Sequence, residues 1–168
     1  MLFESGNITP HSLMDIVNNN GDSVYYLVKE LPEKIRQAGL ATVKAFGVKS
    51  RFIHLEFFVL NEDQEGLGKK GDVLGLEVNM RPAGGFTPEM YNYSQETDVY
   101  KIWADMIAFD CDTKGTGNHH YCAFYSRRDG KQYKFDDYEI MSRYGHKMVM
   151  WGRIPEALSG AMANQMYV

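Results

Sequence analysis

Residues 76–85 constrain the fold of this chain most, because apolar and polar residues alternate through 76–81. A period of two is typical of a β-strand with one face toward a core. The apolar positions are Leu76, Val78 and Met80, and the polar positions are Glu77, Asn79 and Arg81. We expect Pro82 to end the strand, and Gly84-Gly85 to let the backbone approach a bound group closely.

The polar face of this strand combines a carboxylate, an amide and a guanidinium, a set that is costly to bury without partners. A divalent cation together with a phosphate would satisfy all three groups. The oxygens of Glu77 and Asn79 are hard metal ligands, and the guanidinium of Arg81 matches a phosphate with two hydrogen bonds. The strand therefore predicts a metal and phosphate site. The competing interpretation is an ordinary solvated outer face.

A second strand, at residues 51–60, is expected to pair with the first. It is rich in aromatic and β-branched residues, and a polar, glycine-rich stretch at 61–72 separates the two segments. This order predicts an antiparallel hairpin with a long loop. Glu56 lies within a nearly continuous apolar run, which is typical of a strand buried on both faces, where an uncompensated carboxylate is costly.

The register of this hairpin decides whether its acidic residues meet. Placing Leu60 opposite Val73 predicts two polar pairs, Glu56 with Glu77 and His54 with Asn79. A slip by two residues would make the acidic pair diagonal. Opposed carboxylates destabilise a sheet by repulsion, and a bound cation removes that repulsion. Mg²⁺ suits such a pair, because it takes a few carboxylates and shares its other positions with substrate phosphates.

Length and composition limit the remaining functions. The chain has 168 residues, enough for one ordinary domain, and a net charge of −4, which gives no electrostatic case for nucleic acid or an anionic membrane surface. We find neither an apolar run long enough to span a membrane nor a signal-peptide pattern. Cys111 and Cys122 lack metal-site spacing and are expected to be reduced thiols, so we expect a cytoplasmic protein.

Other segments alternate between helical and extended patterns. We expect helices within 8–20 with Thr9 as the N-cap, at 32–46, from a Thr97-Asp98 cap through 107, at 136–143, and from Pro155. Further strands are expected at 23–29, 118–127, 147–153 and from 165. The mixed order predicts an α+β fold with a mostly antiparallel sheet flanked by helices.

Two further groups of polar residues are expected to be structural. His119 and His120 adjoin on the predicted strand 118–127, so they point to opposite faces and do not easily bind one metal together. Arg127 and Arg128 follow directly and are expected to be surface charges. Trp103 falls on the apolar stripe of its helix and is expected in the core.

With these residues in view, the hairpin resembles the metal-binding hairpin of the ATP-grasp superfamily. The resemblance is carried by Phe52-Ile53-His54-Leu55-Glu56-Phe57-Phe58 and by Gly75-Leu76-Glu77-Val78-Asn79-Met80-Arg81-Pro82. The continuation through Gly84-Gly85-Phe86-Thr87 and Tyr91-Asn92-Tyr93 is similar to the carboxylate–amine ligase branch. The resemblance to the superfamily runs from about residue 1 to beyond residue 150 and is most specific at the hairpin.

The resemblance implies a role for each polar residue. Glu56 and Glu77 match the two acidic ligands, of which Glu77 bridges two Mg²⁺ (or Mn²⁺) ions, and Asn79 matches the amide ligand. Arg81 matches the catalytic residue that faces the transferred phosphate of ATP, and Gly84-Gly85 is expected to lie beside the nucleotide. ATP would phosphorylate a small carboxylate, and an amine would then attack the acyl phosphate, as in carboxylate–amine ligases and carbamoyl-phosphate synthetase.

Parts of such an enzyme cannot be placed in this sequence, notably the phosphate-covering loop, the lysines for ATP and the adenine-binding hinge. We therefore expect residues 1–168 to form a single domain, the C-terminal metal-binding portion of a longer ATP-grasp enzyme that is inactive on its own. Two alternatives stay open: a non-catalytic ATP-grasp-like module that binds a partner, and a metal hydrolase that uses His54, Glu56 and His119 or His120. The oligomeric state is also open, a homo-oligomer included.

Overall fold

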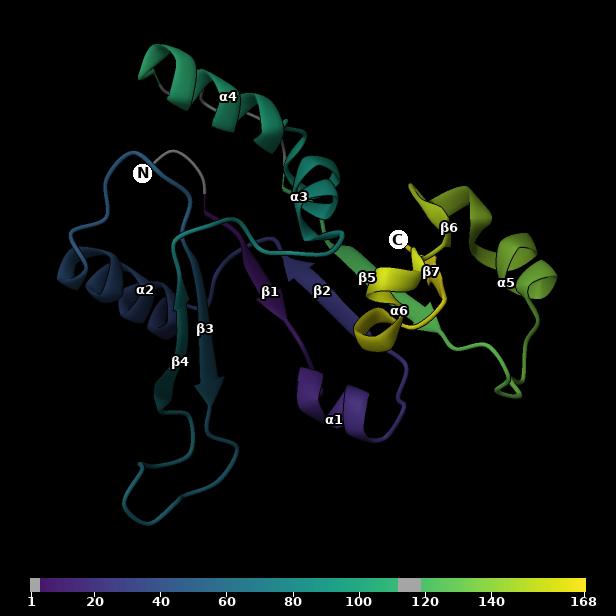
Figure 1. Ribbon diagram of the computed structural model, residues 1–168. Helices are drawn as coiled ribbons and strands as arrows, with labels where there is room; N and C mark the ends of the chain where they lie inside the picture. The colour runs from purple at the N-terminus through teal and green to yellow at the C-terminus, as the bar shows by residue number, and fades with distance from the viewer. Residues whose placement is uncertain (1–3, 112–118) are drawn as a thin grey trace. The chain divides into compact units, whose positions relative to one another are not determined.

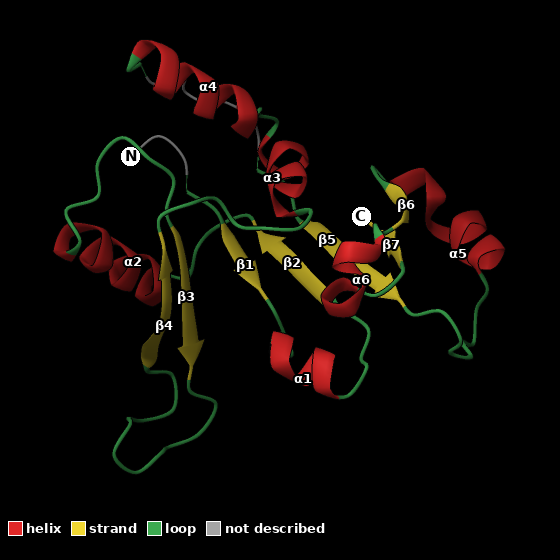
Figure 2. Cartoon of the chain, in the orientation of Figure 1, coloured by secondary structure: helices red, strands yellow, loops and turns green. Residues whose placement is uncertain are grey.

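A computed structural model describes residues 4–111 and 119–168 of the chain. These residues form two compact units, one built mainly from 30–88 and 98–111, the other from 5–29, 89–97 and 119–168. The fold is α+β, every described strand ladder is antiparallel, and helices flank the sheet, which confirms the predicted fold class (Figure 2).

The first unit holds the predicted hairpin. It comprises α2 (Glu33–Ala45), β3 (His54–Val59), β4 (Val73–Asn79) and α4 (Val99–Phe109), and β3 and β4 form a two-stranded sheet of their own. Figure 1 shows α2 beside β4, and the two elements are in contact. A side chain added at Gly39 of α2 would lie 3.7 Å from Leu55 Cδ1, so α2 covers the face of β3 that carries Leu55.

Capping residues and a glycine set the ends of the helices in this unit. The Asp98 side chain accepts hydrogen bonds from the amides of Tyr100 and Lys101 and caps α4, as predicted. Helix α2 ends just before Gly47, whose φ of +60° is a conformation that favours glycine. Trp103 was predicted in the core, but it is 40% exposed, and one side of its ring packs on Phe52 at 5.8 Å between centroids.

The second unit contains a five-stranded antiparallel sheet in the order β1-β2-β5-β7-β6. Its strands are β1 (Gly6–Ile8), β2 (Val24–Val28), β5 (Cys122–Arg127), β6 (Trp151–Arg153) and β7 (Gln165–Tyr167). Its helical segments are α1 (Leu13–Asn18), most of α3 (Thr87–Gln95), α5 (Asp137–Tyr144), a 3₁₀ turn (Gly145–Lys147) and α6 (Glu156–Met162). Leu27 and Phe124 are fully buried at its centre, where the Phe124 ring stacks on Tyr25 at 4.7 Å.

The sequence located most of these elements, but one helix cap, two missed elements and the starts of two strands differ, since the predicted strand 147–153 begins only at Trp151. Ser12 and not Thr9 caps α1, since the Ser12 side chain accepts from the Asp15 amide. Strand β1 and helix α3 were not predicted, because neither shows a long periodic pattern. The predicted strand 118–127 begins only at Cys122, and its first residue lies outside the described part of the chain.

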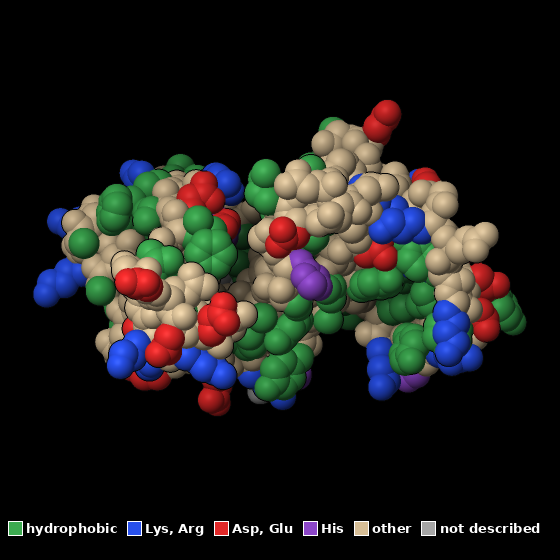
Figure 3. Space-filling view, turned by 90° about the horizontal axis from the view of Figure 1, so that it is seen from below, with side chains coloured by type: hydrophobic (Ala, Val, Ile, Leu, Met, Phe, Trp, Pro, Cys, Tyr) green, Lys and Arg blue, Asp and Glu red, His purple; other side chains and the backbone are tan. Residues whose placement is uncertain are grey.

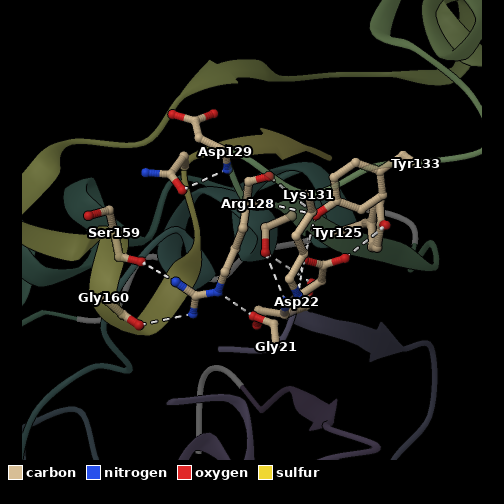
Figure 4. Close-up of polar contacts among 12 residues, drawn as sticks. Gly21, Asp22, Tyr125, Arg128, Asp129, Lys131, Tyr133, Ser159 and Gly160 are labelled. Carbon is tan, nitrogen blue, oxygen red and sulfur yellow. Dashed lines mark hydrogen bonds and ion pairs between the residues drawn. The ribbon is translucent and has the colours of Figure 1, made fainter. Parts of the chain in front are cut away.

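Arg127 and Arg128 correct a prediction, because both are buried. The Arg128 guanidinium donates to the carbonyl oxygens of Gly21 (2.6 Å), Ser159 (3.1 Å) and Gly160 (3.0 Å), as Figure 4 shows. It therefore ties the turn after α1 to α6. A buried cation with three acceptors is satisfied, and we assign it a structural role.

A second group of contacts joins the same loop to β5. The Tyr133 hydroxyl donates to Asp22 at 2.7 Å and accepts from the Arg128 amide at 2.8 Å (Figure 4). Burial, helped by the hydrogen bond to Asp22, raises the pKa of Tyr133 to about 12. The Cys122 thiol in β5 is buried, and burial raises its pKa to about 11, so it serves as a small core residue.

The exposed surface is mixed in character. Acidic and basic side chains are interspersed on the face drawn in Figure 3, with hydrophobic side chains among them. Of the helices that the structure describes, none has both the length and the apolar character needed to cross a bilayer.

Candidate metal and phosphate site

The hairpin brings the predicted polar pairs together. Glu56 lies directly opposite Glu77, and His54 lies directly opposite Asn79. Directly opposed residues of an antiparallel pair project from the same face, with Cβ atoms about 4.5–5.5 Å apart. Because Leu55 faces α2, alternation turns all four side chains to the other face of the hairpin.

The strand pairing at the loop end of the hairpin differs from the predicted register. Leu60 was placed opposite Val73, which is wrong: Val59 lies opposite Val73. The Leu60 amide instead donates to the carbonyl oxygen of Asp72 at 3.0 Å. The predicted register is therefore off by one residue at the loop end of the hairpin.

A β-bulge between the loop end and the polar pairs shifts the register by one residue, so that the polar pairs form as predicted. Glu56 lies opposite Glu77, whereas the next residue of β3, Phe57, lies opposite Gly75. Leu76 is thus an extra residue on β4, and the pairing beyond it matches the prediction. A glycine inside a strand pattern often marks a bulge, so Gly75 was the signal that could have located it.

The environment of the acidic pair differs from the prediction in one respect. Strand β3 is not buried on both faces: all of its residues are partly or fully exposed, and Phe58 and Val59 are about half exposed. The Glu56 side chain is 41% exposed, and Glu77 is also exposed. Solvent therefore screens the repulsion, and the acidic pair costs up to about 1 kcal/mol rather than the several kcal/mol of a buried charge.

Two atoms on the same face lack partners. The Nδ1 atom of His54 and the Nδ2 atom of Asn79 are buried, and neither has a hydrogen-bond partner among the described residues. The other ring nitrogen of His54, Nε2, lies 3.6 Å from Glu56 Oε1. Buried polar atoms are nearly always paired, so this face of the hairpin has bonding capacity that the described chain does not use.

An arginine and a pair of glycines follow β4 in the chain. Arg81 is exposed, and its Nη1 atom donates to the carbonyl oxygen of Pro82 at 2.9 Å. Gly85 has a φ of +61°, which favours glycine, and a side chain at Gly84 would meet no atom within 4 Å. The space around Gly84 is therefore open, and the expected approach of a bound group to this turn stays a prediction.

The donors present fit a divalent cation by chemistry. Two carboxylates and an amide oxygen are ligands that Mg²⁺ and Mn²⁺ accept, and an imidazole lies beside them. Within residues 4–111 and 119–168, no three His, Cys, Asp or Glu side chains already converge closely enough to hold a metal ion. Binding would therefore require exposed side chains of this face to change rotamer, which occurs in nanoseconds or less.

The histidine pair lies in the second unit and has partners there. His119 Nδ1 is 3.0 Å from the carbonyl oxygen of Lys29, and His120 Nε2 is 3.0 Å from Glu96 Oε1. The His120 backbone is also held, because its amide donates to the Ser94 carbonyl at 2.7 Å. Both imidazoles thus have structural contacts, as expected.

Comparison with known proteins supplies no relative from which a function could be transferred. No protein-family model, curated protein or solved structure matches this chain. The function is therefore argued from the hairpin itself.

Proposed function

We propose that this chain carries the metal- and phosphate-binding half of an ATP-dependent carboxylate–amine ligase of ATP-grasp type. The observation that carries the proposal is the cross-strand pair of Glu56 and Glu77. Two carboxylates at directly opposed positions are unfavourable in a sheet unless something positive lies between them. Asn79, on the same face, adds an oxygen ligand of the kind that such an ion takes.

Each residue would have a distinct task. Glu56, Glu77 and Asn79 would hold Mg²⁺ or Mn²⁺, which neutralises charge on the phosphate oxygens of ATP. Arg81 follows Asn79 by two residues, in the bend after β4, and would hold the transferred phosphate. Gly84 and Gly85 would let the backbone lie against the nucleotide.

The reaction needs positioning and charge more than a protein nucleophile. A carboxylate oxygen of the substrate attacks the γ-phosphorus of ATP, the bond to the β-phosphate oxygen breaks, and ADP leaves. An amine then attacks the acyl carbon, phosphate leaves, and the amine loses a proton to give the amide. A guanidinium beside the phosphate stabilises the charge that builds up in both steps.

The alternatives make different demands on the same residues. A hydrolase would need His54 and Glu56 to share one ion with His119 or His120, yet both of the latter imidazoles have partners within their own unit. A non-catalytic module would bind no specific divalent cation at millimolar concentration. Metal binding therefore separates this last alternative from the proposal.

A Mn²⁺ titration followed by water-proton relaxation tests the proposal. We expect the chain to bind Mn²⁺ weakly alone and more tightly with ATP, because phosphates complete the metal shell. Glu77→Gln should lose the binding, whereas Glu62→Gln, an exposed acid in the same hairpin loop, should keep it. Equal binding by Glu77→Gln and the parent chain would rule the site out.

The role of Arg81 is tested in the same titration. Arg81→Ala should bind Mn²⁺ alone as the parent does, but should lose the gain that ATP provides. An unchanged ATP effect would remove Arg81 from the phosphate site while leaving the metal ligands in place.

A further inference from the structure

Strand β6 lies at one edge of the five-stranded sheet, and no strand in the described part of the chain pairs with its outer side. Its inner side pairs with β7. Met150, directly before β6, and Val168, directly after β7, exchange two backbone hydrogen bonds of 3.3 Å and 2.7 Å. Along an antiparallel ladder, pairs that exchange hydrogen bonds alternate with pairs that do not. The next bonded pair is therefore Gly152 with Met166, which lie opposite each other.

This alternation leaves two residues of β6 with outward-facing backbone groups. Trp151 and Arg153 lie on either side of Gly152, so their amide and carbonyl groups point away from β7, toward the outer edge. The side chains of both residues are exposed and project from the same face of the sheet. An uncovered edge of this kind is a template on which another strand can pair.

The residues of this edge are complementary to themselves. When two β6 strands pair antiparallel with Gly152 at the centre, Trp151 of each copy lies opposite Arg153 of the other copy. The outward amide and carbonyl groups of both residues then meet in bonded pairs. Each guanidinium also lies beside an indole ring, the aromatic group with the strongest cation–π attraction, and two-fold symmetry makes this contact twice.

The charge and the space at the edge agree with this pairing. The Arg153 guanidinium forms an ion pair with Asp129, with 2.7 Å between Nη1 and Oδ1, so its charge is balanced and does not repel a second copy. A side chain added at Gly152 would meet no atom within 4 Å. A glycine inside a strand often marks a place where another backbone approaches closely.

We propose that β6 is the interface of a symmetric dimer, in which a second copy of this chain continues the sheet across its outer edge. The three residues of β6 in each copy form the new ladder, and Pro155, which has no amide hydrogen, limits its extension. So short a ladder places the dimer among weak complexes, which bury less than about 1,200 Å². The proposal is independent of the metal site in the hairpin.

Sedimentation velocity of the 168-residue chain with EDTA present, up to about 1 mM protein, tests the dimer. Trp151→Thr removes both cation–π contacts and should raise the dissociation constant about fivefold to thirtyfold. Arg153→Met removes the same two contacts and should have the same effect. Tyr138→Ala, which removes an exposed aromatic side chain of α5, is the matched control and should leave the dissociation constant unchanged.

A disulfide test determines the register. In a Cys111→Ser background, which removes the exposed thiol, one variant carries Trp151→Cys and another carries Arg153→Cys. Opposed residues of a bonded pair have Cα atoms about 5.5 Å apart, within the range that a disulfide spans. Mild oxidation of the mixture should therefore give a cross-linked dimer, which keeps one intact Trp–Arg pair. Neither variant should cross-link when oxidised alone.

The outcomes decide the proposal. A chain that stays monomeric throughout the concentration series overturns it. A dimer whose dissociation constant is unchanged in Trp151→Thr and Arg153→Met also overturns it, because that dimer uses another surface. Cross-linking of either cysteine variant alone as readily as of the mixture overturns the register. If Trp151→Thr fails to fold, Arg153→Met and the cross-link still decide the result.

Discussion

Glu77→Gln is expected to stabilise the first unit when no divalent cation is present. The change replaces one of two opposed carboxylates by a neutral amide of the same shape, so the repulsion with Glu56 disappears. Cross-strand pairs contribute about 0.2–1 kcal/mol. Because the Glu56 side chain is 41% exposed, solvent screens part of the repulsion, and we expect a gain of about 0.5 kcal/mol.

Added Mn²⁺ should reverse this order. An ion that binds only the folded chain stabilises it by RT ln(1 + [L]/Kd), which is about 1.4 kcal/mol at ten times the dissociation constant. At the proposed site the parent chain would receive this stabilisation, whereas Glu77→Gln would lack a ligand and receive little of it. The parent should therefore be the more stable protein by about 1 kcal/mol at that concentration.

Urea denaturation followed by Trp103 fluorescence measures both effects. The Trp103 ring packs on Phe52, two residues before His54, so it reports on the unit that holds the hairpin. Trp151→Phe leaves Trp103 as the only tryptophan. A Glu77→Gln protein that is less stable than the parent without metal would refute the repulsion, and equal stabilisation of both proteins by Mn²⁺ would refute the site.

Two predictions concern the second unit. Arg128→Met removes the donor to three backbone carbonyls at once, so we expect a loss of about 3 kcal/mol in urea denaturation followed by Trp151, with a refuting result below about 1 kcal/mol. Arg153→Met, which removes an exposed ion pair with Asp129, is the control and should change little. Since the pKa of Tyr133 rises from 10.0 to about 12 on folding, its contribution to stability is complete below pH 10 and is lost as the pH rises to 12. Tyr133→Phe should flatten that part of the stability profile, and an unchanged profile would contradict the shift.

The elements that local chemistry determines could be predicted from the sequence. The caps Asp98 and Asp136 each lie within three residues of the amides they satisfy, so the starts of α4 and, to within one residue, α5 could be predicted. Burial could not be predicted in the same way. Arg128 is buried because its acceptors include Gly21, 107 residues away in sequence, a relation that no local pattern contains.

In the candidate site, too, features set by local sequence could be predicted and features set by distant contacts could not. The alternation that puts Glu77 and Asn79 on one face is local, and the structure keeps it. The cross-strand partner of Glu77 depends on the loop and on the bulge at Leu76. The pairing at the loop end is one residue away from the prediction, and the extra residue of the bulge restores the predicted partner. The exposure of β3 depends on what packs over the hairpin, and the sequence run alone predicted too much burial.

A solvated outer face and a cation site share the same backbone register, so the pairing alone does not separate them. A two-stranded sheet is marginally stable by itself, and here α2 covers the face with Leu55. The other face could then carry any polar residues. A face selected only for solvation would gain from avoiding opposed carboxylates and buried unpaired nitrogens, yet this one has Glu56 against Glu77 and His54 against Asn79. The opposed carboxylates are unfavourable in the chain alone and would be favourable around an ion. The proposed site therefore predicts that the Glu77→Gln effect on stability changes sign when Mn²⁺ is added.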